Sequence, residues 1–281
     1  MEGHFEIKTT LLGPGSHCAK EMNVLNRRIT WTSQGLMYEA DPKHAKLAVE
    51  AMGLLDAKGV STPGVVEGVE EDAERLSIED ASSYRQITAR LNYLAPDRPD
   101  IQYSVKEVCK SMSNPTTACW QKLTRIGRYL VAHPRMRTLF DFVKGDIRPS
   151  LLGCSDSDWA GDKATRKSTS AGVICVGNHW LKSWAKHQKI IALSSGEAEL
   201  YAAVKTSSEL MGIQSLMKEL GDEIVNMTLF VDAKATIGMV SRKGWVQLNT
   251  FRLQNYGSRM LSEGALLVCA KLIQSSIRPT S

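Results

Sequence analysis

The sequence predicts a mixed α/β (α+β) fold in which a five-stranded mixed sheet with flanking helices follows a small, mostly helical region. Three observations lead to this prediction. Apolar segments of strand length follow one another closely between residues 150 and 186, which is typical of a meander. A long helical pattern over about 195–220 is followed by a further strand near 226–232. Residues 82–138, in contrast, show helical spacing interrupted by prolines.

The composition is that of a globular protein with a modest excess of positive charge. Of 281 residues, 43% are hydrophobic and 23% are charged, and the formal net charge is +5. This charge permits binding to a phosphate backbone without requiring it. No apolar stretch approaches the roughly 18–20 residues of a membrane span, and the N-terminus lacks the apolar core of a signal peptide. We therefore expect no membrane contact. Because the six cysteines have no metal-binding or disulfide spacing, we also expect an intracellular protein with reduced thiols.

Residues 1–64 are predicted to contain a hairpin and a helix. Residues 22–32 have the pattern of a short hairpin, and Asp41-Pro42 predicts the cap and first residue of a helix that extends to about Met52. Residues 65–81 then read as an exposed acidic linker with few large apolar side chains. Its carboxylates include Glu67, Glu70, Glu71, Asp72, Glu74, Glu79 and Asp80.

Three amphipathic helices are expected in residues 82–138. The first ends at Pro96, the second begins at Pro99, and the third begins at Pro115 and ends near His133. Their basic side chains are predicted to form a solvated face, with a nucleic-acid contact as the alternative. These side chains are Lys106, Lys110, Lys122, Arg125 and Arg128.

The α/β unit is expected to occupy residues 139–281. A meander, a long helix and a strand-helix-strand sequence predict a mixed sheet with a helix against it. The expected strands lie at about 150–156, 171–177, 180–186, 226–232 and 265–270, and the expected helices at about 195–220 and 233–241.

Three carboxylates stand at the ends of these elements. Asp156 follows the strand residues 151–154, Glu199 lies near the start of the long helix, and Asp232 ends a second strand. Such a cluster is costly unless cations neutralise it, and Mg²⁺ or Mn²⁺ prefers oxygen ligands. In two-metal nucleases, ions roughly 3.5–4 Å apart clamp the attacking and leaving oxygens. The arrangement therefore indicates phosphodiester chemistry with two ions, and Asp156 is the predicted bridging ligand.

Neighbouring carboxylates offer alternatives. Asp158 and Asp162 compete with Asp156, although Asp158 returns to the same face only if the strand continues. Glu197 competes with Glu199, and only one of them can reach the site because they face different ways on a helix. Single carboxylates at strand ends and helix starts are also common for structural reasons.

The chain resembles the ribonuclease H region, with the end of the reverse transcriptase, of Pol polyproteins from Copia-type LTR retrotransposons. The match runs from about residue 44 to 240, and residues 44–63 resemble the end of the polymerase region. The motifs that carry it are Tyr84-Arg85-Gln86-Ile87, Leu91-Asn92-Tyr93-Leu94-Ala95, Arg98-Pro99-Asp100-Ile101, Ser155-Asp156-Ser157-Asp158-Trp159-Ala160-Gly161-Asp162, Arg166-Lys167-Ser168-Thr169-Ser170 and Ala192-Leu193-Ser194-Ser195-Gly196-Glu197-Ala198-Glu199-Leu200-Tyr201.

The resemblance implies a ribonuclease H-like sheet behind a thumb- or connection-like region, and hydrolysis of the RNA strand of RNA–DNA hybrids with Mg²⁺ or Mn²⁺. Asp156, Glu199 and Asp232 would be the first three members of the family's D-E-D-D set, as catalytic residues and metal ligands. The residues that would lie near the hybrid backbone are Arg166, Ser194 and Ser195, for which helix capping and turn formation are the alternative. The polymerase's Y-x-D-D loop is missing, so the rest of the polyprotein is the expected protein partner.

The tail departs from the family pattern from about residue 244. Gly244-Trp245-Val246-Gln247 stands where the family has a T-K-H-I-D-like stretch, and no Asp follows Asp232 to supply the fourth carboxylate. Back-translation of the tail with all permitted codons admits the family's pattern in a shifted reading frame, which suggests a frameshift near residue 244. As the alternative, Leu261-Ser262-Glu263-Gly264 resembles the family's pattern without a frameshift. We expect either a weakened nuclease, a catalytically inactive nucleic-acid-binding or structural remnant, or a transposon relic.

Overall fold

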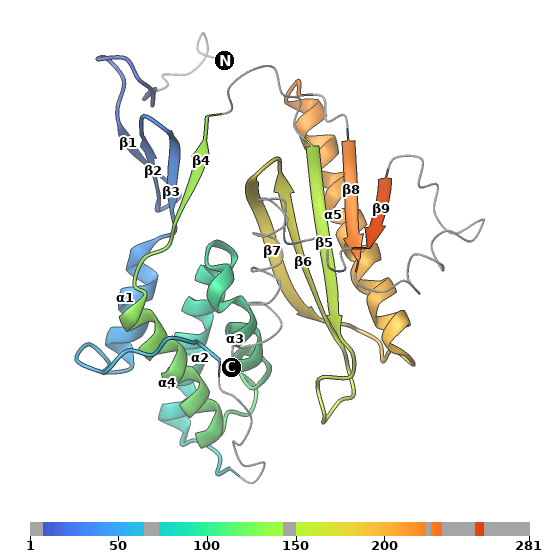
Figure 1. The fold of residues 1–281 in the computed structure, drawn as a ribbon. Helices are drawn as coiled ribbons and strands as arrows, with labels where there is room; N and C mark the ends of the chain where they lie inside the picture. The colour runs from blue at the N-terminus through green and yellow to red at the C-terminus, as the bar shows by residue number, and fades with distance from the viewer. Residues whose placement is uncertain (1–7, 65–72, 143–149, 223–225, 232–250, 256–281) are drawn as a thin grey trace.

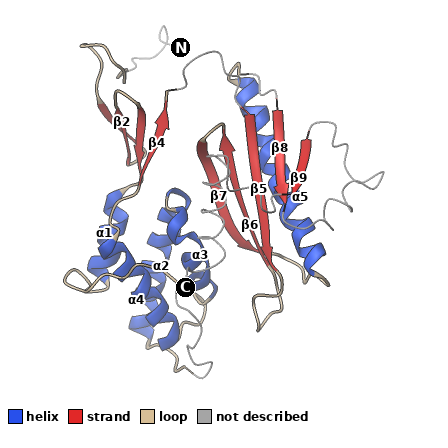
Figure 2. Ribbon diagram, viewed as in Figure 1, coloured by secondary structure: helices blue, strands red, loops and turns tan. Residues whose placement is uncertain are grey.

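The computed structural model describes residues 8–64, 73–142, 150–222, 226–231 and 251–255. Its helices and two sheets confirm the α+β class. Figure 1 shows a small sheet above a helical bundle, and beside the bundle a larger sheet with one long helix. Figure 2 shows the same division by secondary structure. No helix in the described ranges is long and apolar enough to span a membrane.

The small sheet has four antiparallel strands in the order β1-β2-β3-β4. The strands are β1 (Glu21–Val24), β2 (Arg27–Trp31), β3 (Gly35–Glu39) and β4 (Arg137–Asp141). The predicted hairpin is confirmed as β1–β2, whose turn places Leu25 and Asn26 at positive φ. The predicted domain boundary between residues 138 and 139 falls inside β4. This strand belongs to the small sheet because it pairs with β3, about a hundred residues earlier in the chain.

Among the described residues, four helices form the bundle. They are α1 (Pro42–Ala51), α2 (Ile78–Leu94), α3 (Pro99–Lys110) and α4 (Thr117–Ala132), with the short 3-10 helix η1 (Ala95–Asp97) between α2 and α3. Three of them begin at a capping side chain, and α3 begins at Pro99. Asp41, Ser77 and Thr116 each accept a hydrogen bond from a first-turn amide. Because Ser77 caps α2, that helix begins inside the segment predicted as linker. The bundle core includes Tyr84, Leu91, Ile101, Leu123 and Leu130.

The larger sheet is mixed, with the strand order β7-β6-β5-β8-β9. Its strands are β5 (Ser150–Asp158), β6 (Thr169–Val176), β7 (His179–His187), β8 (Asn226–Val231) and β9 (Phe251–Asn255). β5, β6 and β7 form the predicted antiparallel meander, whereas β8 and β9 join in parallel. The fifth strand lies at 251–255, while the predicted strand at 265–270 and helix at 233–241 are outside the described residues.

The long helix α5 (Ser195–Glu219) covers one face of the larger sheet. A core of buried apolar side chains joins the two, with Leu210 and Ala203 from α5 meeting Leu151, Leu229 and Val231 of the sheet. The predicted helix over 195–220 is therefore confirmed.

Helix α3 packs against β7 and joins the bundle to the larger sheet. Gln102 donates to the Ser183 carbonyl and accepts from the Ser183 hydroxyl, both at 3.0 Å. Lys106 donates to Thr169 Oγ1 at 2.9 Å, and its side chain is only 10% exposed. The prediction of a solvated basic face is thus wrong for Lys106, because the second sheet covers this side of α3.

Candidate functional site

The central strand β5 carries Asp156, and α5 crosses it with Glu199 in its second turn. The close approach of helix and strand depends on Gly153. A Cβ at that position would lie 2.7 Å from Leu210 Cδ1 and 3.0 Å from Thr206 Cγ2 of α5, so a larger residue would push the helix away.

The backbone N–H of Ser157 lies between the two carboxylates. It donates to Asp156 Oδ1 at 2.8 Å and to Glu199 Oε1 at 3.1 Å. The Ser157 hydroxyl donates to the same Glu199 oxygen at 2.9 Å. Glu199 is 8% exposed and Asp156 is half-buried. Two carboxylates that share one N–H donor, one of them buried, form an arrangement that suits a bound cation.

Asp232, the third predicted carboxylate, lies outside the described residues. It directly follows Val231, which is the last residue of β8 and pairs with Ser155 of β5. Over the ranges that the structure describes, no group of three or more His, Cys, Asp or Glu side chains could hold a metal ion. The described part of the predicted site is therefore the carboxylate pair Asp156 and Glu199, whose oxygens suit a hard divalent cation.

Glu197, the competitor of Glu199, is engaged at the N-terminus of α5. Its carboxylate accepts from the Leu193 N–H at 2.8 Å and from the Tyr201 hydroxyl at 2.9 Å. Its own N–H donates to Ser194 Oγ at 3.2 Å, so serine and glutamate cap the helix together. The two glutamates thus have different environments: Glu199 contacts β5, and Glu197 stabilises the helix end.

Asp158 and Asp162, the competitors of Asp156, lie toward α3. β5 continues through Asp158, which pairs with Thr169, the residue that Lys106 contacts. Asp162 accepts from the N–H groups of Ala164 and Thr165 and forms a 3.3 Å ion pair with Lys110. Burial opposes ionisation of Asp162, but its amide hydrogen bond and Lys110 together lower its pKa. Asp162 therefore has a structural role in the β5–β6 loop.

The three residues predicted near a substrate backbone occupy two loops. Ser194 is the N-cap of α5, and Ser195 is its first residue, with both side chains exposed. Arg166 is exposed in the β5–β6 loop with φ at 57°. Its N–H donates to the Asp162 carbonyl at 2.7 Å. Capping and turn formation thus account for the backbone roles of Ser194 and Arg166 and leave their exposed surfaces open to a ligand.

Sequence reasoning missed two residues around the carboxylates. Ser157 was passed over because it lies between two aspartates that carry the more obvious chemistry. Gln188 had no signal in the sequence, since its partners, Ser170 and Ala198, lie on other elements.

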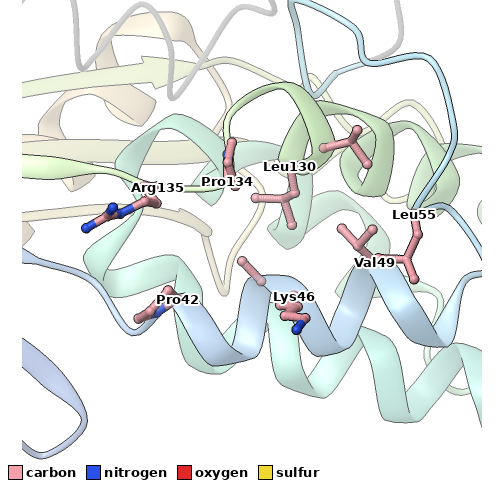
Figure 3. Close-up of a pocket in the computed structure, with 9 residues that line it drawn as sticks. Pro42, Lys46, Val49, Leu55, Leu130, Pro134 and Arg135 are labelled. Atoms are coloured by element: carbon pink, nitrogen blue, oxygen red, sulfur yellow. The ribbon is translucent and has the colours of Figure 1, made fainter.

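A separate cavity of about 320 Å³ lies between α1 and α4, away from the carboxylates (Figure 3). Its lining is mainly apolar, with Val49, Leu55 and Leu130 on its walls and Lys46 and Arg135 among its polar residues. It contains none of the predicted site residues.

No protein-family model matches the chain. The sequence is 38% identical over 168 residues to a retrovirus-related Pol polyprotein from transposon RE1 of Arabidopsis thaliana, across 60% of this chain and 11% of the polyprotein. It is 30% identical over 247 residues to the Pol polyprotein from transposon TNT 1-94 of Nicotiana tabacum, across 84% of this chain and 17% of the polyprotein.

A shorter relative is covered more completely. The chain is 32% identical over 176 residues to an uncharacterised mitochondrial protein of Arabidopsis thaliana, across 62% of this chain and 71% of that protein. Of the Pol polyproteins it spans less than a fifth. These likenesses show that the chain is homologous, over 60–84% of its length, to a segment of retrovirus-related Pol polyproteins from Copia-type retrotransposons.

Proposed function

We propose that the larger sheet and α5 form a ribonuclease H-like domain that hydrolyses the RNA strand of RNA–DNA hybrids. The observation that carries this proposal is the meeting of Asp156 and Glu199 on the Ser157 N–H, from a central strand and a helix that crosses it. Homology to Pol polyproteins from transposons supports the same reaction class.

The residues fit a divalent metal site. Asp156 and Glu199 provide anionic oxygens, which Mg²⁺ and Mn²⁺ prefer, and Asp232 is the proposed third ligand. Bound ions would supply charge stabilisation to the phosphate and lower the pKa of an attacking water.

The protein's own residues would fix the direction of a metal-binding carboxylate and hold the backbone of the hybrid. Ser157 fixes one oxygen of Glu199 with two hydrogen bonds, which sets the direction of the carboxylate before any ligand arrives. The exposed Arg166 and Ser194 are proposed to hold the hybrid backbone, since guanidinium and hydroxyl groups are common phosphate donors.

The test is cleavage of a labelled RNA–DNA hybrid in Mg²⁺ and in Mn²⁺ by the wild type and four variants. Asp156→Asn and Glu199→Gln should each lower cleavage by on the order of 100-fold or more, as expected when a group that stabilises transition-state charge is removed. The matched controls, Glu197→Gln and Asp162→Asn, remove nearby carboxylates that have structural partners and should retain cleavage within a few-fold at temperatures where they stay folded. Equal loss in all four variants would contradict the assignment.

The departure of Gly244-Trp245-Val246-Gln247 from the family pattern favours a second candidate, a catalytically inactive module that binds nucleic acid. Folded wild type that binds the hybrid in a salt-dependent way without cleaving it in either metal would support this candidate and overturn the proposed nuclease.

A further inference from the structure

Gln188 is a buried glutamine that joins three elements next to the carboxylate pair. It directly follows β7 and is 7% exposed. Its backbone N–H donates to the Ser168 carbonyl at 2.8 Å. Its side-chain Nε2 donates to Ser170 Oγ and to the Ala198 carbonyl, both at 2.9 Å. Because a carbonyl can only accept, the contact with Ala198 fixes which end of the amide faces α5.

Both hydrogen-bond partners of the Gln188 side chain lie next to residues of the carboxylate pair, one along the sequence and one across the sheet. Ala198 immediately precedes Glu199 on α5. Ser170 of β6 pairs with Ser157 of β5, and Ser157 donates two hydrogen bonds to Glu199. The amide of Gln188 therefore bridges the helix that carries Glu199 and the strand pair that carries Asp156.

We infer that Gln188 is a positioning residue that sets the distance between Glu199 and Asp156, and so tunes divalent-metal affinity at this pair. The inference rests on the proposed function. Only a long neutral side chain with two N–H groups can donate at once to Ser170 and Ala198 from this buried position. Its role differs from that of Ser157, which contacts Glu199 directly, because Gln188 acts on the helix backbone. Partners of this kind, which orient a ligand without touching the metal, typically change affinity or activity about 10–100-fold when they are replaced.

The experiment compares wild type with Gln188→Leu, which removes both donors, and Gln188→Glu, which keeps the shape and the contact with Ser170 but cannot donate to the Ala198 carbonyl. The control is Gln102→Leu, another buried glutamine with two hydrogen bonds, located between α3 and β7. Three quantities are measured: Mn²⁺ affinity by titration calorimetry, the Mg²⁺ concentration for half-maximal hybrid cleavage, and hydrogen exchange of the amides over 195–202 without metal.

Both Gln188 variants should weaken Mn²⁺ binding and raise the half-maximal Mg²⁺ concentration by about 10-fold, the lower end of the range for such partners. Amide exchange in the first turns of α5 should become faster in both. Gln102→Leu should leave all three quantities within about twofold of wild type, even if its melting temperature falls as far as that of the Gln188 variants. If Gln188→Glu, which keeps the shape of the native side chain, binds Mn²⁺ with wild-type affinity and exchanges at the wild-type rate, the inference is overturned.

The two proposals fail in different ways. Wild type that neither binds Mn²⁺ nor cleaves the hybrid overturns the proposed function, and with it the effect of Gln188 on metal affinity. Wild type that does both, together with Gln188 variants that behave as the control does, overturns only the role of Gln188.

Discussion

At the scale of single residues, this protein distinguishes between carboxylates by their hydrogen-bond partners. Glu197 and Glu199 are two positions apart, yet one caps a helix and the other meets Asp156 across a shared amide. Asp162 is likewise held by backbone N–H groups and Lys110. Residue type alone predicts none of these differences, because each depends on which polar groups the fold brings within about 3 Å.

Glu39 shows the same principle in the small sheet and leads to a pH prediction. It is 4% exposed and accepts hydrogen bonds from Arg135, at 2.6 Å from Nη2. The hydrogen bond to Arg135, opposed by burial and aided by the charges of Arg135, Arg137 and Arg28, lowers the pKa of Glu39 below 4.5. A lowered carboxyl pKa gives stability that is fully present above the unfolded pKa and lost as pH falls through the folded value.

The expected consequence is measurable by denaturant unfolding at pH 6.5 and pH 3.5. Glu39→Gln should lose about 1.5 kcal/mol at pH 6.5, near the lower end for a hydrogen bond to a charged group. Its stability should also decline less than that of wild type on going to pH 3.5. Glu21→Gln, which alters an exposed 3.3 Å ion pair with Arg28, is the control and should follow wild type closely. A pH dependence in Glu39→Gln equal to that of wild type would refute the assignment.

At the scale of elements, the start of α5 combines a structural and a proposed ligand role. Ser194 caps the helix by accepting from the Glu197 N–H, and its side chain is exposed. Glu199 lies only a short way along the same helix. Loss of the cap would therefore loosen the backbone that presents a site carboxylate, in addition to any loss of contact with a substrate.

The two roles of Ser194 can be separated by substitution. Ser194→Ala should lower stability by about 1 kcal/mol, the typical value for a lost N-cap. Ser194→Asp should restore most of that stability, because aspartate is also a good cap and its charge suits a helix N-terminus. If Ser194 contacts the hybrid backbone, Ser194→Asp should bind hybrid more weakly than Ser194→Ala, since its charge repels phosphate. Equal hybrid affinity for the two variants, measured by fluorescence anisotropy at low salt, would leave Ser194 with the capping role alone.

At the scale of the whole molecule, α3 holds the helical bundle against the larger sheet. The contacts are polar and buried: Gln102 with Ser183, and Lys106 with Thr169. Burial lowers the pKa of Lys106, while its neighbour Glu107 opposes this effect. Each of these polar groups has its hydrogen-bond partner in the opposite unit. Separating the bundle from the larger sheet would therefore break these hydrogen bonds.

Gln102→Leu should therefore destabilise the protein by about 1–3 kcal/mol, because it leaves the buried Ser183 without its partners. It should also make calorimetric unfolding less cooperative, since the bundle and the larger sheet would melt more independently. Gln121→Leu changes an exposed glutamine on α4 and should alter stability by no more than about 0.5 kcal/mol. A single sharp transition of wild-type stability in Gln102→Leu would show that this contact does not couple the two units.

The sequence by itself determined the helices, the meander β5–β6–β7, the strand before Asp232 and the family, because each follows from local periodicity, caps and motifs. It could not predict β3 and β4, since their pairing joins residues far apart in the chain. The sequence favoured Asp156 over its competitors Asp158 and Asp162, but it could not predict the partners of these carboxylates, and it gave no sign of Gln188. Those assignments depend on long-range contacts: the tertiary structure turns Asp162 and Lys106 toward the α3 interface and Glu199 toward Ser157. Only the folded chain decides which polar groups share a buried space, because a hydrogen bond depends on distance and not on sequence separation.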